Sequence, residues 1–250
     1  MASPAAQRYQ SDTERDARTA SDGSDGMTEA PETLARTASL DYDHPAVAEF
    51  TRRSAGTGTA RERAVRLYYA VRDGIRYDPY AFHVAPEWLT ASRTLQAGYG
   101  WCVPKALLLA ACCRAAGIPA RLGYADVKNH LATERLLRMM DNELFVWHGY
   151  VALRLEGRWV KATPAFNIEM CRRFGVLPLE FDGTADSLLH PYDVRGQRHM
   201  EYVRDRGLFD DLPYDTLVAD MRAAYPRLIA AAEAKIPPGS FETDAVHAAR

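Results

Sequence analysis

The sequence predicts an α+β fold in which an apolar helix that begins with a cysteine packs against an antiparallel β-sheet. Two segments carry this prediction. Residues 98–117 combine a small-residue loop, a cysteine and a nearly continuous apolar run, and residues 144–164 contain two β-rich runs separated by a short turn. An apolar run of helical length is expected to be buried on most sides. Two strand-like runs around a two-residue turn that contains Gly predict a β-hairpin.

The expected helix begins at Cys102. Pro104 suits the first helical turn because a missing N–H costs little there, whereas Gly117 suits the C-terminal cap and Pro119 stops any continuation. Unpaired N–H groups and the helix dipole favour a thiolate at the start of a helix. Cys102 is therefore a candidate nucleophile. The alternative interpretation is a core cysteine that happens to lie near a helix start.

The expected hairpin carries His148. With Glu156-Gly157 as the turn, Leu155 faces Arg158, and strand alternation places His148 and Thr163 on one face as diagonal neighbours, about 7 Å apart. A lone histidine on a strand is usually structural or merely exposed, but thiol catalysis needs a base, so His148 is the candidate base. The opposite, apolar face of the hairpin is expected to pack on the core; it consists of Trp147, Val151, Leu153, Leu155, Val160 and Ala162.

The order of these motifs resembles that of the transglutaminase-like superfamily, which shares a core with papain-like cysteine proteases. The matching segments are Gly100-Trp101-Cys102 with its helix, residues 115–121, His148 with its strand, residues 157–164, and a lead-in at residues 73–78. The resemblance covers roughly residues 61–167. It implies a papain/transglutaminase-like core with Cys102 as the nucleophile and His148 as the general base and acid.

One position departs from the family pattern. The third catalytic residue is usually an aspartate just before the proline of the second hairpin strand, and this chain has Thr163 there. A hydroxyl could accept a hydrogen bond from the imidazole, but it cannot stabilise an imidazolium as a buried carboxylate does. Either Thr163 orients His148 weakly, or Asn167 or Asp126 supplies that role, or the site is impaired.

Gln96 is a candidate oxyanion donor because papain-like enzymes have a glutamine at this spacing, six residues before the cysteine. The alternative interpretation is a polar residue that faces a loop. The backbone N–H of Cys102 is the safer donor, since it lies at the helix start.

Composition limits the classes of function. The 250 residues are 47% hydrophobic with a net charge of −2, so no global basic field indicates a nucleic-acid partner. No run is long enough for a membrane span, and no cysteine or histidine spacing is typical of zinc. No cofactor is expected. Four cysteines without a disulfide framework favour a reducing cytoplasm.

The sequence divides into three parts. Residues 1–40 are rich in small, polar and acidic residues, which predicts a disordered acidic extension. Residues 41–236 form the expected domain, with the motif core at 61–167 and a C-terminal wrap and helix at 168–236. Residues 237–250 are expected to be a loose tail.

Further elements follow from periodicity. Helices are expected at 45–51, 60–72, 129–142 and 214–234, and a strand at 118–127. The helix at 129–142 could border the active site, and residues 77–88 are expected to be a loop that covers it. After Asn167 the sequence predicts only a short strand and an irregular wrap.

Two functions of different classes are consistent with the sequence. The first is an enzyme that forms a thioester at Cys102, takes an amide or a thioester as acyl donor and uses water or an amine as acceptor. Its substrate would be a peptide, an amide or an acyl thioester, including carrier-bound acyl groups. The second is a catalytically silent binding domain that has kept the fold, for which Thr163 in place of aspartate is the main argument.

Overall fold

A four-stranded antiparallel sheet forms the centre of the computed structural model, which describes residues 31–130, 132–188, 200–234 and 241. The strand order is β5-β4-β3-β6, with β3 at Ala120–Asn129, β4 at Leu144–Leu155, β5 at Arg158–Ala162 and β6 at Met200–Phe209. A second, two-stranded parallel sheet joins β1 (Arg76–Tyr77) to β2 (Tyr99–Gly100). The mixed α+β class predicted from the sequence is confirmed.

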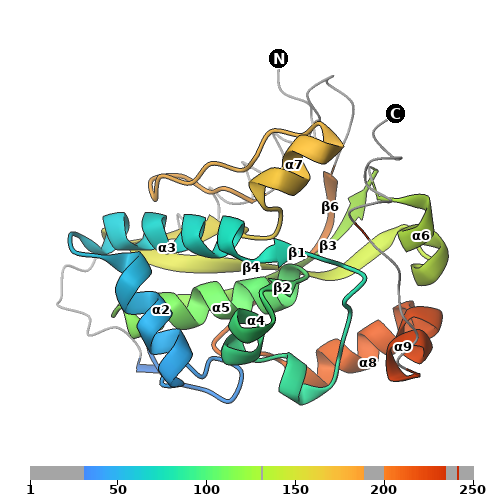
Figure 1. Cartoon of the computed structure of the whole chain (residues 1–250), viewed down its shortest axis with the longest axis horizontal. Coiled ribbons are helices and arrows are strands. Elements are labelled where there is room, and N and C mark those ends of the chain that lie inside the picture. The colour runs from blue at the N-terminus through green and yellow to red at the C-terminus, as the bar shows by residue number, and fades with distance from the viewer. Residues whose placement is uncertain (1–30, 131, 189–199, 235–240, 242–250) are drawn as a thin grey trace.

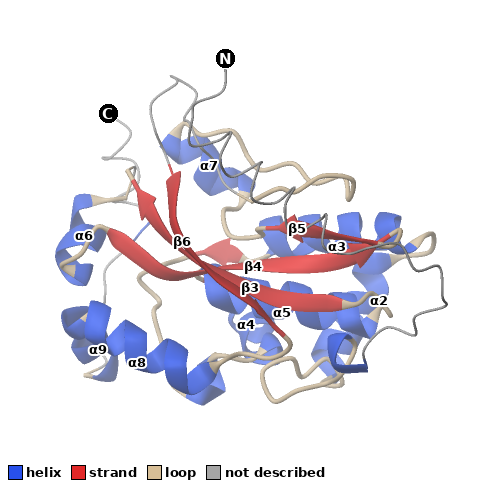
Figure 2. Cartoon of the chain, turned by 180° about the vertical axis from the view of Figure 1, so that it is seen from behind, coloured by secondary structure: helices blue, strands red, loops and turns tan. Residues whose placement is uncertain are grey.

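Helix α5 (Cys102–Ala115) runs along one face of the large sheet, and it is seen behind the strands in Figure 2. Every residue from Cys102 to Arg114 is buried, as the apolar run predicts. Helices α2 (Pro45–Ala55), α3 (Ala60–Gly74) and α4 (Ala91–Ala97) pack around α5 (Figure 1). The core therefore lies between α5, its helical neighbours and the sheet.

The hairpin register agrees with the sequence prediction. Leu155 pairs with Arg158, and the two turn residues, Glu156 and Gly157, have φ values of 51° and 79°. The predicted strand at 118–127 is β3. The helix predicted at 129–142 is the shorter α6 (Glu134–Met140), which begins after Thr133 because the Thr133 hydroxyl accepts a hydrogen bond from the Leu136 N–H.

The segment 31–40 does not fit the predicted disorder. It begins with a 3₁₀ turn, η1 (Pro31–Thr33), and Leu40 is fully buried in the core. The buried Arg114 guanidinium donates to the Ala35 carbonyl at 2.7 Å, and the Thr37 hydroxyl donates to Asp211 at 2.7 Å. Composition does not predict these contacts, because each one depends on a partner far away in the sequence. The prediction for residues 1–30 lies outside the described residues.

The C-terminal part is more regular than the sequence predicts. Helix α7 (Ile168–Phe174) follows β5, and the ten-residue strand β6 pairs with β3 at eight positions. The single helix predicted at 214–234 is two helices, α8 (Tyr214–Ala224) and α9 (Pro226–Glu233). The break falls at Tyr225 because Pro226 lacks an N–H and disfavours a helical conformation in the residue before it.

One residue of the predicted loose tail is described, and it is not loose. Phe241 is 5% exposed, and its ring lies 5.2 Å from that of Tyr80 and 5.7 Å from that of Phe174. The remaining residues of the tail, 237–240 and 242–250, lie outside the described residues. Of the helices that the structure describes, none combines the length and the hydrophobicity that crossing a bilayer requires.

Candidate active site

Cys102 is the first residue of α5, where the sequence predicts it. Trp101 precedes it in an extended conformation and provides no side-chain cap, so the N–H groups of the first turn are not covered by a capping side chain. Lys105, in the same turn, is fully buried, and its amine donates to the carbonyls of Arg72 at 2.8 Å and Ile75 at 2.5 Å. These bonds tie the start of α5 to the end of α3 and so fix the position of the cysteine.

Strand β4 approaches the start of α5 closely at Gly149. A Cβ atom at this position would lie 3.2 Å from the Cα of Val103, 3.3 Å from the Cys102 carbonyl oxygen and 3.4 Å from the Cβ of Ala106. Only glycine allows the strand to pack on the helix at this distance without displacement. Since His148 directly precedes Gly149, this contact brings the histidine to the helix start.

Cys102 and His148 line the same pocket, and both are buried, with exposed fractions of 7% and 4%. The pocket encloses about 420 Å³ of empty space, including its open mouth. Its remaining lining is apolar or aromatic and comprises Tyr77, Pro79, Phe82, Trp101, Leu136, Met140, Phe145, Val146, Met221, Tyr225 and Leu228. The structure thus brings together the two residues that the sequence singled out as nucleophile and base.

The predicted cover of the site is also present. Tyr77, Pro79 and Phe82 come from the aromatic segment that was expected to cover it, and Leu136 and Met140 come from α6. The part of the wall that α8 and α9 provide was not predicted from the sequence. Their apolar faces were visible in the sequence, but nothing in a sequence pattern says which distant surface such a face covers.

The pKa of the Cys102 thiol is higher than a position at a helix start alone would predict. Burial raises its pKa to about 11, although the backbone N–H groups of Gly149, Val103 and Cys102 itself act in the opposite direction. The expected thiolate is therefore corrected to a protonated thiol at neutral pH, because removal from water outweighs the helix start. A base must take the proton as the sulfur attacks.

Thr163 does not make the predicted bond to His148. Among the described residues its buried hydroxyl oxygen has no hydrogen-bond partner. The backbone of Thr163 is held instead: its N–H donates to the Ser187 carbonyl at 2.9 Å, and its carbonyl accepts from the Tyr68 hydroxyl at 3.2 Å. The predicted position was a diagonal one, and threonine is too short to cross a separation of about 7 Å.

The other candidates for orienting residue and oxyanion donor are engaged elsewhere. Gln96 is exposed, and its amide nitrogen lies 3.4 Å from Nε2 of His44, so it does not line the pocket of Cys102. The oxyanion role suggested for Gln96 is therefore not supported, and the backbone N–H of Cys102 remains the candidate donor. Asp126 accepts from the Trp147 N–H at 3.1 Å.

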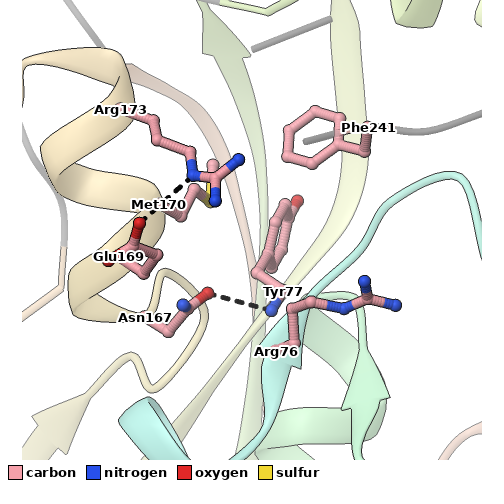
Figure 3. Close-up of a pocket in the computed structure, with 7 residues that line it drawn as sticks. All are labelled: Arg76, Tyr77, Asn167, Glu169, Met170, Arg173 and Phe241. Atoms are coloured by element: carbon pink, nitrogen blue, oxygen red, sulfur yellow. Dashed lines mark hydrogen bonds and ion pairs between the residues drawn. The ribbon is translucent and has the colours of Figure 1, made fainter. Parts of the chain in front are cut away.

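Asn167 lies in a separate, smaller pocket between α7 and β1, where its side-chain oxygen accepts from the Tyr77 N–H at 3.0 Å (Figure 3). Figure 3 shows Arg173 turned toward Glu169, at 3.4 Å, and Phe241 beside the Tyr77 ring. Asn167 thus supports Tyr77, which lines the Cys102 pocket as well. It supports the cover of the pocket and does not contact its catalytic end.

The segment that matches a known family includes Cys102 and His148. Residues 47–164 match the Transglutaminase-like superfamily. The match contains α5, β4 and the turn at residues 156–157, and it confirms the resemblance seen in the sequence. This part of the chain is similar to a transglutaminase-like core.

Two solved structures show weaker similarity. A proposed cysteine protease from Cytophaga hutchinsonii is 16% identical, with a TM-score of 0.43 over 75% of this chain and 53% of that one. A proposed protease from Parabacteroides distasonis is 18% identical, with a TM-score of 0.35 over 52% of this chain and 26% of that one. The chain thus spans about half the length of the first protein and about a quarter of the second. No curated protein sequence matches the chain significantly.

Proposed function

We propose that the protein is a cysteine-dependent acyl-transfer enzyme that forms a thioester at Cys102. The observation that carries the proposal is the shared pocket: a cysteine at the start of a buried helix and a histidine on the neighbouring strand line one cavity. Nucleophilic catalysis by a thiol needs a base within reach and a place for the acyl group. His148 and the apolar cavity beside Cys102 support the proposal on these two points.

The proposed reaction has two steps. In the first, His148 takes the Cys102 proton as the sulfur attacks the carbonyl carbon of the donor, and the backbone N–H of Cys102 stabilises the oxyanion. The donor's bond to its thiol or amine breaks, and that leaving group receives the proton from His148. In the second, His148 takes a proton from water or an amine, which attacks the thioester. The acid or amide leaves, and the Cys102 thiol regains its proton.

Activated donors suit this site better than peptide bonds. The thiol carries a raised pKa, and Thr163 offers no carboxylate to stabilise an imidazolium. A thiol leaving group needs less assistance from an acid than an amine does. We therefore expect thioesters to react faster than matched amides, and we expect the apolar lining of the pocket to favour an amine acceptor over water.

The test is turnover of one acyl group presented as a thioester and as an amide, with and without an added primary amine. We expect thioester turnover by the wild type and by Cys171→Ala, a matched buried cysteine outside the pocket, and none by Cys102→Ala. Equal turnover by Cys102→Ala would remove the proposal.

A catalytically silent binding domain is the second candidate. The protonated thiol and the Thr163 hydroxyl, which lacks a hydrogen-bond partner among the described residues, favour it. This candidate predicts that neither donor is turned over by the folded wild type, while small apolar ligands still bind in the pocket.

A further inference from the structure

We infer that the Cys102 pocket selects donors with an uncharged, apolar acyl group, an inference that rests on the function proposed above. None of the described residues that line the pocket carries a charged Lys, Arg, Asp or Glu side chain. A carboxylate or ammonium group on the acyl chain would lose its water without gaining a partner. An alkyl or aryl chain would instead replace water against apolar walls.

The walls are formed by buried apolar side chains. Leu136 and Met140 of α6 and Met221 of α8 are 1–3% exposed, and Leu228 of α9 is 4% exposed. Tyr225, between α8 and α9, also lines the pocket, and its hydroxyl is already used: it donates to the Leu144 carbonyl at 2.8 Å and accepts from the Val146 N–H at 2.5 Å. It therefore closes the wall at β4 and offers no polar group to a ligand.

Part of the apolar wall lies outside the segment that matches the superfamily. Met221, Tyr225 and Leu228 follow residue 164, where the superfamily match ends. Figure 1 shows α8 and α9 at the end of the molecule below α6, away from α3. Cys102 and His148 thus lie within the matched segment together with most of the wall, and the C-terminal part of the chain adds Met221, Tyr225 and Leu228 to that wall.

A series of donors with growing chains measures how long an acyl group the pocket accepts, because its 420 Å³ of empty space includes the open mouth. Each methylene buried against the wall should raise kcat/KM by about fourfold until the pocket is full. N-acetylcysteamine thioesters of acetate, butanoate, hexanoate and octanoate provide this series, and the glutarate monothioester provides a charged acyl group of similar length.

Two neighbouring residues of α9 make a matched pair of variants. Leu228 and Ile229 are 4% and 5% exposed, but only Leu228 lines the pocket. We expect Leu228→Ala to lower kcat/KM for the octanoyl thioester about tenfold with little change for the acetyl thioester, and Ile229→Ala to leave their ratio unchanged. The inference would be overturned if both variants lost kcat/KM equally for the two substrates. It would also be overturned if the glutaryl thioester had the same kcat/KM as the hexanoyl thioester.

Binding measurements test the selectivity of the pocket independently of the reaction. Octanamide should bind the Cys102→Ala protein in calorimetry more tightly than acetamide, and Leu228→Ala in that background should weaken it. If octanamide binds in this way but no thioester is turned over by the wild type, the pocket stands and the proposed function fails. If thioesters are turned over with no dependence on chain length, the function stands and the apolar selectivity fails.

A separate observation concerns the residue before the candidate base. Trp147 has a φ of 60°, a left-handed conformation that is unfavourable for a bulky side chain. The pairing of β3 with β4 shifts here: Ala125 pairs with His148, but Val127 pairs with Phe145, so β4 contains a bulge. Bulges of this kind redirect neighbouring side chains and are frequent beside active sites.

Three elements hold Trp147 in this conformation. Its backbone N–H donates to Asp126 of β3 at 3.1 Å, and its indole N–H donates to Asp220 of α8 at 3.0 Å. Arg206 of β6 binds both carboxylates, at 2.5 Å each, and its guanidinium lies 4.5 Å from the centre of the indole ring. The Asp126 side chain is buried and that of Arg206 is mostly buried, whereas the Asp220 side chain is 40% exposed.

We propose that Trp147, Asp126 and Arg206 are positioning residues that aim His148 at Cys102. Removing Arg206 leaves two carboxylates close together, and the strained conformation loses its support. We expect Arg206→Ala to lower kcat at least tenfold with little change in KM, and Arg206→Lys to recover part of the loss. Arg121→Ala is the control, because Arg121 pairs with Asp210 at 2.7 Å on the same sheet without lining the pocket.

The imidazole signals of His148 in NMR distinguish positioning from general stability. In folded Arg206→Lys the His148 resonances should move, and the rate of Cys102 alkylation should change its dependence on pH. Both should match the wild type in Arg121→Ala. An unchanged His148 spectrum and pH profile in Arg206→Lys would overturn this proposal, even if the melting temperature fell.

Discussion

The end of the pocket that holds Cys102 and His148 differs from the wall that α8 and α9 provide. The first depends on backbone geometry: a helix start, a glycine contact and a bulged strand fix two polar side chains. The second depends on apolar side chains, which are Met221, Tyr225 and Leu228. Small displacements should therefore damage chemistry at the first region, whereas volume and polarity should control substrate choice at the second.

The largest expected effect lies at the candidate base. Replacing His148 by alanine should lower thioester turnover about a hundredfold or more, since no other group would take the thiol proton. His130→Ala is the control, because the His130 side chain is 41% exposed and faces Glu201 at 3.7 Å. Steady-state kinetics would decide, and equal rates for the two variants would contradict the pairing of Cys102 with His148.

The second largest effect is expected at Gly149, where β4 contacts α5. In Gly149→Ala the new methyl would press on Val103 and on the Cys102 carbonyl, and β4 would have to move away from α5. We expect a loss of about tenfold or more in kcat, because small misplacements of catalytic groups are costly. Gly74→Ala, at a position with nothing within 4 Å of the added atom, should keep the wild-type rate. A fully active Gly149→Ala protein would show that this approach does not set the catalytic geometry.

Stability should distinguish two parts of the N-terminal segment. Deleting residues 1–40 removes the fully buried Leu40 and the Ala35 carbonyl that Arg114 binds. We expect the melting temperature to fall by about 5–15 °C. Deleting only residues 1–30, which composition predicts to be disordered, should change it little. Calorimetry of the two truncated proteins makes the comparison, and equal melting temperatures would mean that residues 31–40 add nothing to the core.

The smallest effect is expected at Thr163. Its buried hydroxyl has no hydrogen-bond partner among the described residues, so an isosteric methyl removes no hydrogen bond. Thr163→Val should keep kcat/KM within about twofold of the wild type and should not lower stability. A large loss of turnover would restore the orienting role that the sequence suggested for this hydroxyl.

The two regions also differ in how far the sequence predicts them. The helix start at Cys102, the turn at 156–157 and the strand of His148 follow from local patterns, because turns and helix ends depend on neighbouring residues. The packing of α9 on the pocket and the burial of Leu40 depend on contacts between distant segments, which no local pattern contains. The pKa of Cys102 was misjudged for the same reason, since burial is a property of the whole fold.

Acylation of Cys102 is the central claim, and mass spectrometry of the intact protein tests it most directly. The protein would be mixed with octanoyl-N-acetylcysteamine and quenched in acid within seconds. Its intact mass gives the number of acyl groups per chain, and a digest of the same sample locates them. If Cys102 is the nucleophile, we expect one octanoyl group per chain, on the peptide that contains Cys102, with no group on Cys112, Cys113 or Cys171. A folded protein that carries no adduct while it turns the thioester over, or an adduct on another cysteine that survives in Cys102→Ala, would contradict it.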